Sequence, residues 1–167
     1  MKEKLQFVRL PIVLFVVFFI GNLILGAAMG VNQNSYNLAK RLFSMVIFEA
    51  HVGLLWGAVG RRYRGYGIGG SIAAVVLAVF VAQVLIFAAT AVSYLAGIQT
   101  FFNFAEALNQ PPNTVLSFGA AMATRTGGLI GNCIIGVITG AIGWALGGLI
   151  PASATSPAGM REEAVSR

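Results

Sequence analysis

Long apolar stretches, separated by short polar or charged segments, make up most of the chain. They cover residues 10–31, 42–60, 68–97 and 126–150. A helix of about 20 mainly apolar residues is long enough to cross the hydrocarbon core of a bilayer. The pattern therefore predicts an all-α integral membrane protein, a four-helix bundle whose helices run up and down across the membrane.

The remaining segments are expected at the membrane surfaces. Residues 1–9 precede the first helix, residues 61–67 form a basic turn, and residues 98–125 form a long loop that contains a helix lying in the membrane interface. Pro151 ends the fourth helix because proline cannot continue the helical hydrogen-bond ladder. The tail 151–167 is rich in Ala, Ser, Pro and Glu and is expected to be disordered.

Two of these assignments have alternatives. The first stretch has a positively charged start and ends in small residues, so it also resembles a secretory signal, although its apolar run is longer than a typical signal core. The fourth helix has an alternative start near Thr114 with a break at Gly127 and Gly128. In that case Arg125 would lie deeper in the membrane and would need a partner.

Composition agrees with a lipid environment. Of the 167 residues 57% are hydrophobic and only 10% are charged, with a mean hydropathy of +0.83, whereas soluble domains carry about a quarter charged residues. A net charge of +6 would suggest nucleic acid as a partner of a soluble protein, but here the basic residues flank apolar stretches, where they face anionic lipid. We therefore expect no nucleic-acid partner, and expect membrane lipids together with other membrane subunits or further copies of the chain.

The basic residues also predict the orientation, because short loops rich in Lys and Arg stay on the cytoplasmic side. With both termini in the cytoplasm, the opposite side holds only Lys40, Arg41 and Arg125. This orientation makes the chain a multi-pass protein, most simply of a bacterial inner membrane. The turn residues Arg61, Arg62 and Arg64 are expected to contact lipid headgroups. In this orientation the cytoplasmic side holds the remaining basic residues, namely Lys2, Lys4, Arg9, Arg61, Arg62, Arg64, Arg161 and Arg167.

A few polar residues interrupt the spans. Asn22, Glu49 and Asn132 all lie about 10 to 13 Å below the outer boundary at 1.5 Å per residue, and Gln83 lies nearer the middle. We expect these four residues to form one polar cluster inside the bundle. The cluster either only fixes helix register through hydrogen bonds, or makes Glu49 a proton or cation site, since an ionisable group at that depth is costly unless it is paired or neutral.

Glycines share helix faces with these polar residues, at the spacing of three or four residues that returns to one side of a helix. Small faces let membrane helices approach closely, so we expect them to be the packing faces. They are Gly26 and Gly30 on the first helix, Gly53, Gly57 and Gly60 on the second, and Gly136, Gly140, Gly143 and Gly147 on the fourth.

His51 lies on a different face of its helix from Glu49, because two residues correspond to about 200° of rotation. A lone histidine on such a face can ligate a haem or a chlorophyll-type pigment, with a second copy of the chain supplying a second ligand. Without that role, no cofactor is expected. The sequence holds no cluster with metal-ligand spacing and no catalytic triad or HExxH motif, so we expect no metal and no enzymatic activity.

Three functional hypotheses follow. The first is a non-catalytic accessory or scaffold subunit of a larger membrane assembly, which packs through its glycine-rich helix faces. The second is a small oligomeric channel or transporter with a polar path around Glu49. The third is a pigment-binding or haem-binding membrane subunit that uses His51.

Overall fold

The computed structural model describes residues 6–150, so the tail expected to be disordered lies outside the described part. Within that part every regular element is a helix: α2 (Arg9–Met29), α3 (Gln33–Leu42), α4 (Met45–Arg64), α5 (Ile68–Leu95), the short 3₁₀ helix η1 (Ala105–Leu108) and α6 (Phe118–Gly147). Four segments are long and apolar enough to cross a membrane, namely α2, α3 together with α4, α5, and α6. These four candidate spans indicate a multi-pass membrane protein.

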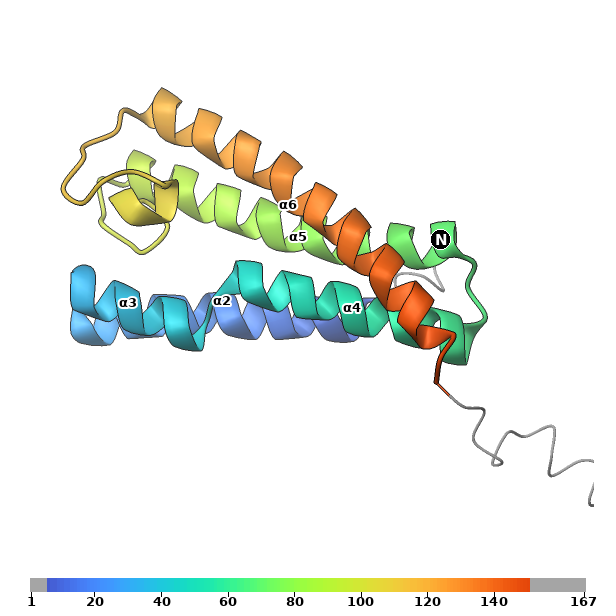
Figure 1. Ribbon diagram of the computed structural model, residues 1–167. Coiled ribbons are helices and arrows are strands. Elements are labelled where there is room, and N and C mark those ends of the chain that lie inside the picture. The colour runs from blue at the N-terminus through green and yellow to red at the C-terminus, as the bar shows by residue number, and fades with distance from the viewer. Residues whose placement is uncertain (1–5, 151–167) are drawn as a thin grey trace, which may run out of the picture.

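Successive long helices run back and forth, and α6 runs obliquely to the others (Figure 1). At one end α4 passes into α5 through the turn 65–67, which we call the turn end. At the other end lie α3 and the connection 96–117 with η1, which we call the loop end. Gly65 ends α4 with a φ of 63°, in the left-handed region that glycine enters without steric cost.

Helices α4 and α6 cross in close contact near the turn end and separate toward the loop end (Figure 1). A Cβ atom added to Gly57 would lie 2.5 Å from the carbonyl oxygen of Gly140 and 2.9 Å from the amide nitrogen of Trp144. A Cβ on Gly147 would lie 2.5 Å from the carbonyl oxygen of Ala58. The two backbones thus approach most closely where glycines face the other helix, and small residues permit such an approach.

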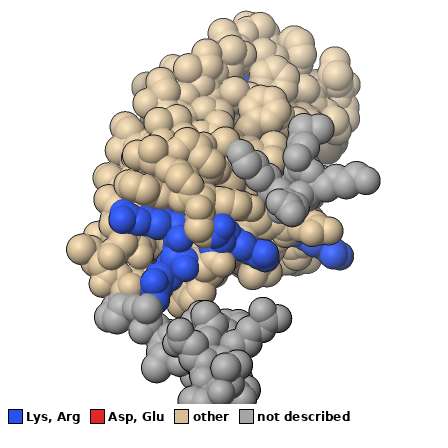
Figure 2. Space-filling model, turned by 90° about the vertical axis from the view of Figure 1, so that its right-hand side faces the viewer, with Lys and Arg blue, Asp and Glu red and all other residues tan. Residues whose placement is uncertain are grey.

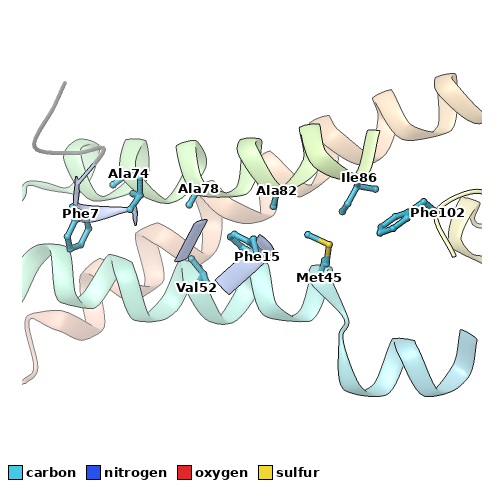
Figure 3. Close-up of a cluster of buried hydrophobic side chains, with 10 residues drawn as sticks. Phe7, Phe15, Met45, Val52, Ala74, Ala78, Ala82, Ile86 and Phe102 are labelled. Atoms are coloured by element: carbon cyan, nitrogen blue, oxygen red, sulfur yellow. The ribbon is translucent and has the colours of Figure 1, made fainter. Parts of the chain in front are cut away.

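The interior of the bundle combines large side chains of α2 and α4 with a small-residue face of α5 (Figure 3). Phe15 of α2 is fully buried beside Val52 of α4, and its ring contacts Phe48 edge-on at 5.0 Å between centroids. The facing residues of α5 are Ala74, Ala78 and Ala82, all with no exposed surface. Small side chains on α5 therefore leave room for the phenylalanines.

The structure adds two details to the loop end. In the segment where a helix in the membrane interface is expected, the Phe102 ring stacks on Phe19 at 4.9 Å and Leu108 is fully buried. The fourth helix begins at Phe118 rather than at 126, and runs through Gly127 and Gly128 without a break. Its start is explained by Ser117, whose hydroxyl accepts a hydrogen bond from the Ala120 amide at 3.3 Å and so caps the helix.

Candidate functional site

A cavity of about 390 Å³ occupies the space where α4 and α6 separate. Its walls come from α3, α4, α5, α6 and the segment around η1, and Asn22 of α2 also reaches it. The polar and charged side chains among its lining residues are Asn22, Tyr36, Lys40, Ser44, Gln83, Glu106, Asn109, Thr124, Arg125 and Asn132. A cavity with this many polar groups inside an otherwise apolar bundle is the strongest candidate site among the described residues.

Helix α3 brings Tyr36 and Lys40 to the cavity. It begins at a capping box, in which the Asn32 side chain accepts from the Asn34 and Ser35 amides at 3.0 Å and the Ser35 hydroxyl accepts from the Asn32 amide at 3.1 Å. This arrangement satisfies backbone groups that a helix start otherwise leaves unpaired. The helix is short and ends before Ser44 starts α4, so α3 places its polar residues beside the loop end.

Arg125 links three parts of the loop end. Its Nε donates to the Thr90 hydroxyl of α5 at 2.9 Å, and its Nη2 donates to the Phe102 carbonyl at 2.5 Å. The Thr90 hydroxyl in turn donates to the same carbonyl at 3.0 Å. These bonds hold the side chain in one orientation, and neither of them uses Nη1 of this cavity-lining residue.

Glu106 of η1 lies in the same cavity wall and has a different environment. Both of its carboxylate oxygens are removed from solvent and have no hydrogen-bond partner among the described residues. Desolvating a carboxylate without a partner is costly. The cavity lining therefore combines two cationic residues, Arg125 and the exposed Lys40, with the Glu106 carboxylate, which has no hydrogen-bond donor among the described residues.

The four polar residues expected to cluster all lie at or beside this cavity. Gln83 and Asn132 line it. The Gln83 side-chain amide also donates a hydrogen bond of 2.6 Å to Glu49 Oε1. Glu49 is 2% exposed, and its Oε2 has no partner among the described residues. Asn22 lines the cavity too, but its amide donates to the Phe18 and Phe43 carbonyls at 2.9 and 3.1 Å rather than to another member. Only Glu49 and Gln83 are joined directly.

The glycines have unequal surroundings. Gly53, Gly57, Gly143 and Gly147 lie at the α4–α6 crossing, Gly136 and Gly140 face Val75 and Val79 of α5, and Gly60 faces Ser71. On α2 the contacts are looser: an added Cβ would lie 3.4 Å from the Phe101 ring at Gly26 and near nothing at Gly30, which ends the helix with a φ of 70°. The closest approach on α2 is at Gly21, whose Cβ would lie 2.8 Å from the Phe43 ring.

The remaining residues singled out in the sequence lie away from the cavity. His51 is exposed, and its Nδ1 lies 2.8 Å from the Ile47 carbonyl. This bond would orient the ring of a ligand histidine, but nothing else gathers there, and the described residues hold no group of three potential metal ligands. The haem or pigment hypothesis at His51 stays a prediction.

Basic side chains gather at the turn end, where Figure 2 shows them in a band with no acidic residue in view. The last turn of α4 carries Arg61, Arg62 and Arg64. Arg61 contacts another part of the protein: its guanidinium lies over the Trp144 ring at 4.0 Å and donates a hydrogen bond of 3.3 Å to the Trp144 carbonyl. Since carbonyls at a helix C-terminus attract cations, this contact fastens α4 to the end of α6.

The sequence interpretation did not include Tyr36, Lys40, Thr90 and Glu106 in the site. Tyr36, Lys40 and Glu106 lie in the segments between the predicted spans. Thr90 lies within a span, but a threonine hydroxyl there can donate to a carbonyl of its own helix, as Thr90 does to Ile86, and so indicates no site. The only available signal was Glu106, a single acidic residue in an aromatic segment next to a membrane helix. Comparison with known proteins adds no assignment: the chain matches no protein-family model, no curated protein and no solved structure.

Proposed function

We propose that this protein binds a small polar group within the membrane and works as a transporter, with the cavity between α4 and α6 as its binding site. The observation that carries the proposal is the cavity itself, about 390 Å³ with Arg125, Glu106 and Lys40 in its walls. Small-molecule sites occupy roughly 300–1,000 Å³ and have a few converging polar groups. Purely structural polar contacts between membrane helices would need no such space.

The expected orientation of the chain in the membrane supports the same proposal. With the basic turn end in the cytoplasm, as the distribution of Lys and Arg favours, the cavity belongs to the outer half of the bundle. Its deepest lining residues along α5 and α6 are Gln83 and Asn132. Beyond them the close α4–α6 crossing at Gly57 and Gly140 closes the cytoplasmic half. This is an outward-facing arrangement, in which release to the other side requires the crossing to open.

Cysteine accessibility tests the proposal. In a Cys133→Ser background, which removes the only native thiol, Asn132→Cys places a thiol at the deep end of the cavity. Ile130→Cys places one on a face that is 55% exposed outside it. We expect a charged, water-soluble thiol reagent to modify the first variant from the loop end and to spare the second, which contacts lipid. Equal modification, or none at Asn132→Cys, would contradict a polar cavity reachable from water.

A second candidate is the accessory subunit of a larger assembly, and the outward face of α6 favours it. Gly127 and Gly131 have nothing within 4 Å of an added Cβ. Small residues on a lipid-facing helix permit close approach of another helix. Gly131→Leu would then release partners or further copies from a native preparation in mild detergent, and leave the cavity reactivity of Asn132→Cys unchanged.

A further inference from the structure

Part of the cavity rim is formed by exposed residues of α4 and α6. On the α4 side the rim is formed by Val46 and Ile47, which are 47% and 57% exposed. On the α6 side it is formed by Thr124 and Gly128, and Gly128 has nothing within 4 Å of an added Cβ. Polar groups thus lie inside, and an apolar edge lies at the opening.

We propose that the cavity takes a phospholipid from the side, with its headgroup inside and its acyl chains left in the bilayer, and that the preferred headgroup is a phosphate carrying a primary ammonium. The proposal rests on the proposed function and names the ligand of that same site. The source of the ligand is the bilayer, because a solute arriving only from water would gain nothing from an apolar rim such as Val46 and Ile47, whereas the first segments of acyl chains would contact it favourably.

The charges inside match both parts of such a headgroup. The guanidinium of Arg125 is fixed by Thr90 and Phe102 while its Nη1 is left over, and Lys40 adds a second cation in the same wall. Guanidinium and ammonium groups are the usual protein partners of phosphate. Both oxygens of Glu106 are enclosed by protein atoms and lack a donor. Turning this side chain toward the cavity that the residue lines would let the primary ammonium of the same headgroup supply one. A quaternary ammonium has no N–H to donate, and a glycerol headgroup has no cation.

Headgroup preference is tested with the full-length protein in lipid nanodiscs. Bound lipid is counted by native mass spectrometry with phosphatidylethanolamine, phosphatidylcholine and phosphatidylglycerol offered in equal amounts. We expect phosphatidylethanolamine to be retained about tenfold over the other two, the size of one charge-assisted hydrogen bond. Equal retention of all three lipids would overturn the headgroup assignment.

Two variants then separate the roles of the charges. Glu106→Gln removes the negative charge and one of two acceptor oxygens, neither of which has a protein partner. The fold should therefore persist while the preference over phosphatidylglycerol is lost. Lys40→Met should weaken binding of all three lipids. Arg41→Met is the matched control, because it removes a neighbouring exposed cation that does not line the cavity. A preference unchanged in Glu106→Gln, or an equal loss in Lys40→Met and Arg41→Met, would contradict the assignment.

The sideways route is tested with neighbouring glycines. Gly128→Leu places a large side chain at the rim, whereas Gly127→Leu places it on the adjacent face outside the cavity, and neither has a near neighbour. We expect Gly128→Leu to exclude lipid and Gly127→Leu to retain it. Equal retention in both variants would overturn the route.

A further arm distinguishes this proposal from the proposed function. Soluble glycerophosphoethanolamine is added to the Asn132→Cys variant of the Cys133→Ser background, and protection of the thiol is measured. Protection together with a failure to retain any lipid would overturn the lipid source and preserve a site for a soluble headgroup. An unreactive thiol at Asn132→Cys would overturn the proposed function itself.

Discussion

The side-chain amide of Gln83 donates a hydrogen bond of 2.6 Å to the carboxyl group of Glu49, and so joins α5 to α4 in the middle of the bundle. Both residues are almost fully buried. The amide also lines the cavity, so the pair forms a polar floor between the cavity and the glycine crossing. The carboxyl group keeps one oxygen, Oε2, without a partner among the described residues.

Removing the amide should cost more than removing the whole pair. Gln83→Leu leaves the Glu49 carboxyl group buried without its donor, and we expect the free energy of unfolding to fall by about 1–3 kcal/mol. The double variant Glu49→Leu with Gln83→Leu removes both polar groups and should recover most of that loss. Reversible unfolding in mixed detergent micelles, followed by circular dichroism, measures the difference. A double variant no more stable than Gln83→Leu would show that the pair is not the source of the cost.

The glycine crossing predicts a position-dependent effect of one added methyl group. Gly57→Ala would place a Cβ against backbone atoms of Gly140 and Trp144, and we expect a loss of about 1–3 kcal/mol from overpacking. Gly131→Ala on the open face of α6 should be neutral or stabilising by up to about 1 kcal/mol, because alanine favours the helix. Thermal unfolding in the same detergent compares the two. Equal effects would mean that the crossing is looser than described.

The Arg125 network predicts that the loop end loosens when its donors are lost. Arg125→Gln removes the bonds to Thr90 and to the Phe102 carbonyl, so backbone amides of the connection 96–108 should exchange with solvent faster. Thr90→Val should reproduce part of the effect, since this hydroxyl also donates to Phe102. Hydrogen exchange followed by mass spectrometry checks both variants. Peptides of the α4–α6 crossing serve as the internal control and should be unaffected.

The orientation expected from the distribution of Lys and Arg predicts opposite reactivity of thiols placed at the two ends. In the Cys133→Ser background, Gln99→Cys at the loop end should react with a membrane-impermeant reagent on intact cells. Gly67→Cys in the basic turn should react only after the membrane is permeabilised. Both positions are exposed, so burial does not explain a difference between them. The reverse pattern would place the termini outside and the cavity on the cytoplasmic side.

The sequence alone determined the fold class and the number of candidate spans, because partition into lipid is a property of about 20 consecutive residues and needs no knowledge of their neighbours. It also placed the polar positions Asn22, Glu49, Gln83 and Asn132 within the spans. Helix periodicity, however, gives only directions around one helix. It does not reveal which residues of two helices meet, whereas the structure places Gln83 of α5 directly against Glu49 of α4.

Only the tertiary structure decided that these residues surround a cavity. The cavity lies where α4 and α6 separate, beyond the point at which their glycines come close together. Such crossing geometry depends on two helices at once. Glu106, Tyr36 and Lys40 reach it from segments whose place depends on long-range contacts such as the stacking of Phe102 on Phe19. Local patterns along the chain carry no information on such contacts. The sequence therefore predicts the candidate membrane spans but not the residues that surround the cavity.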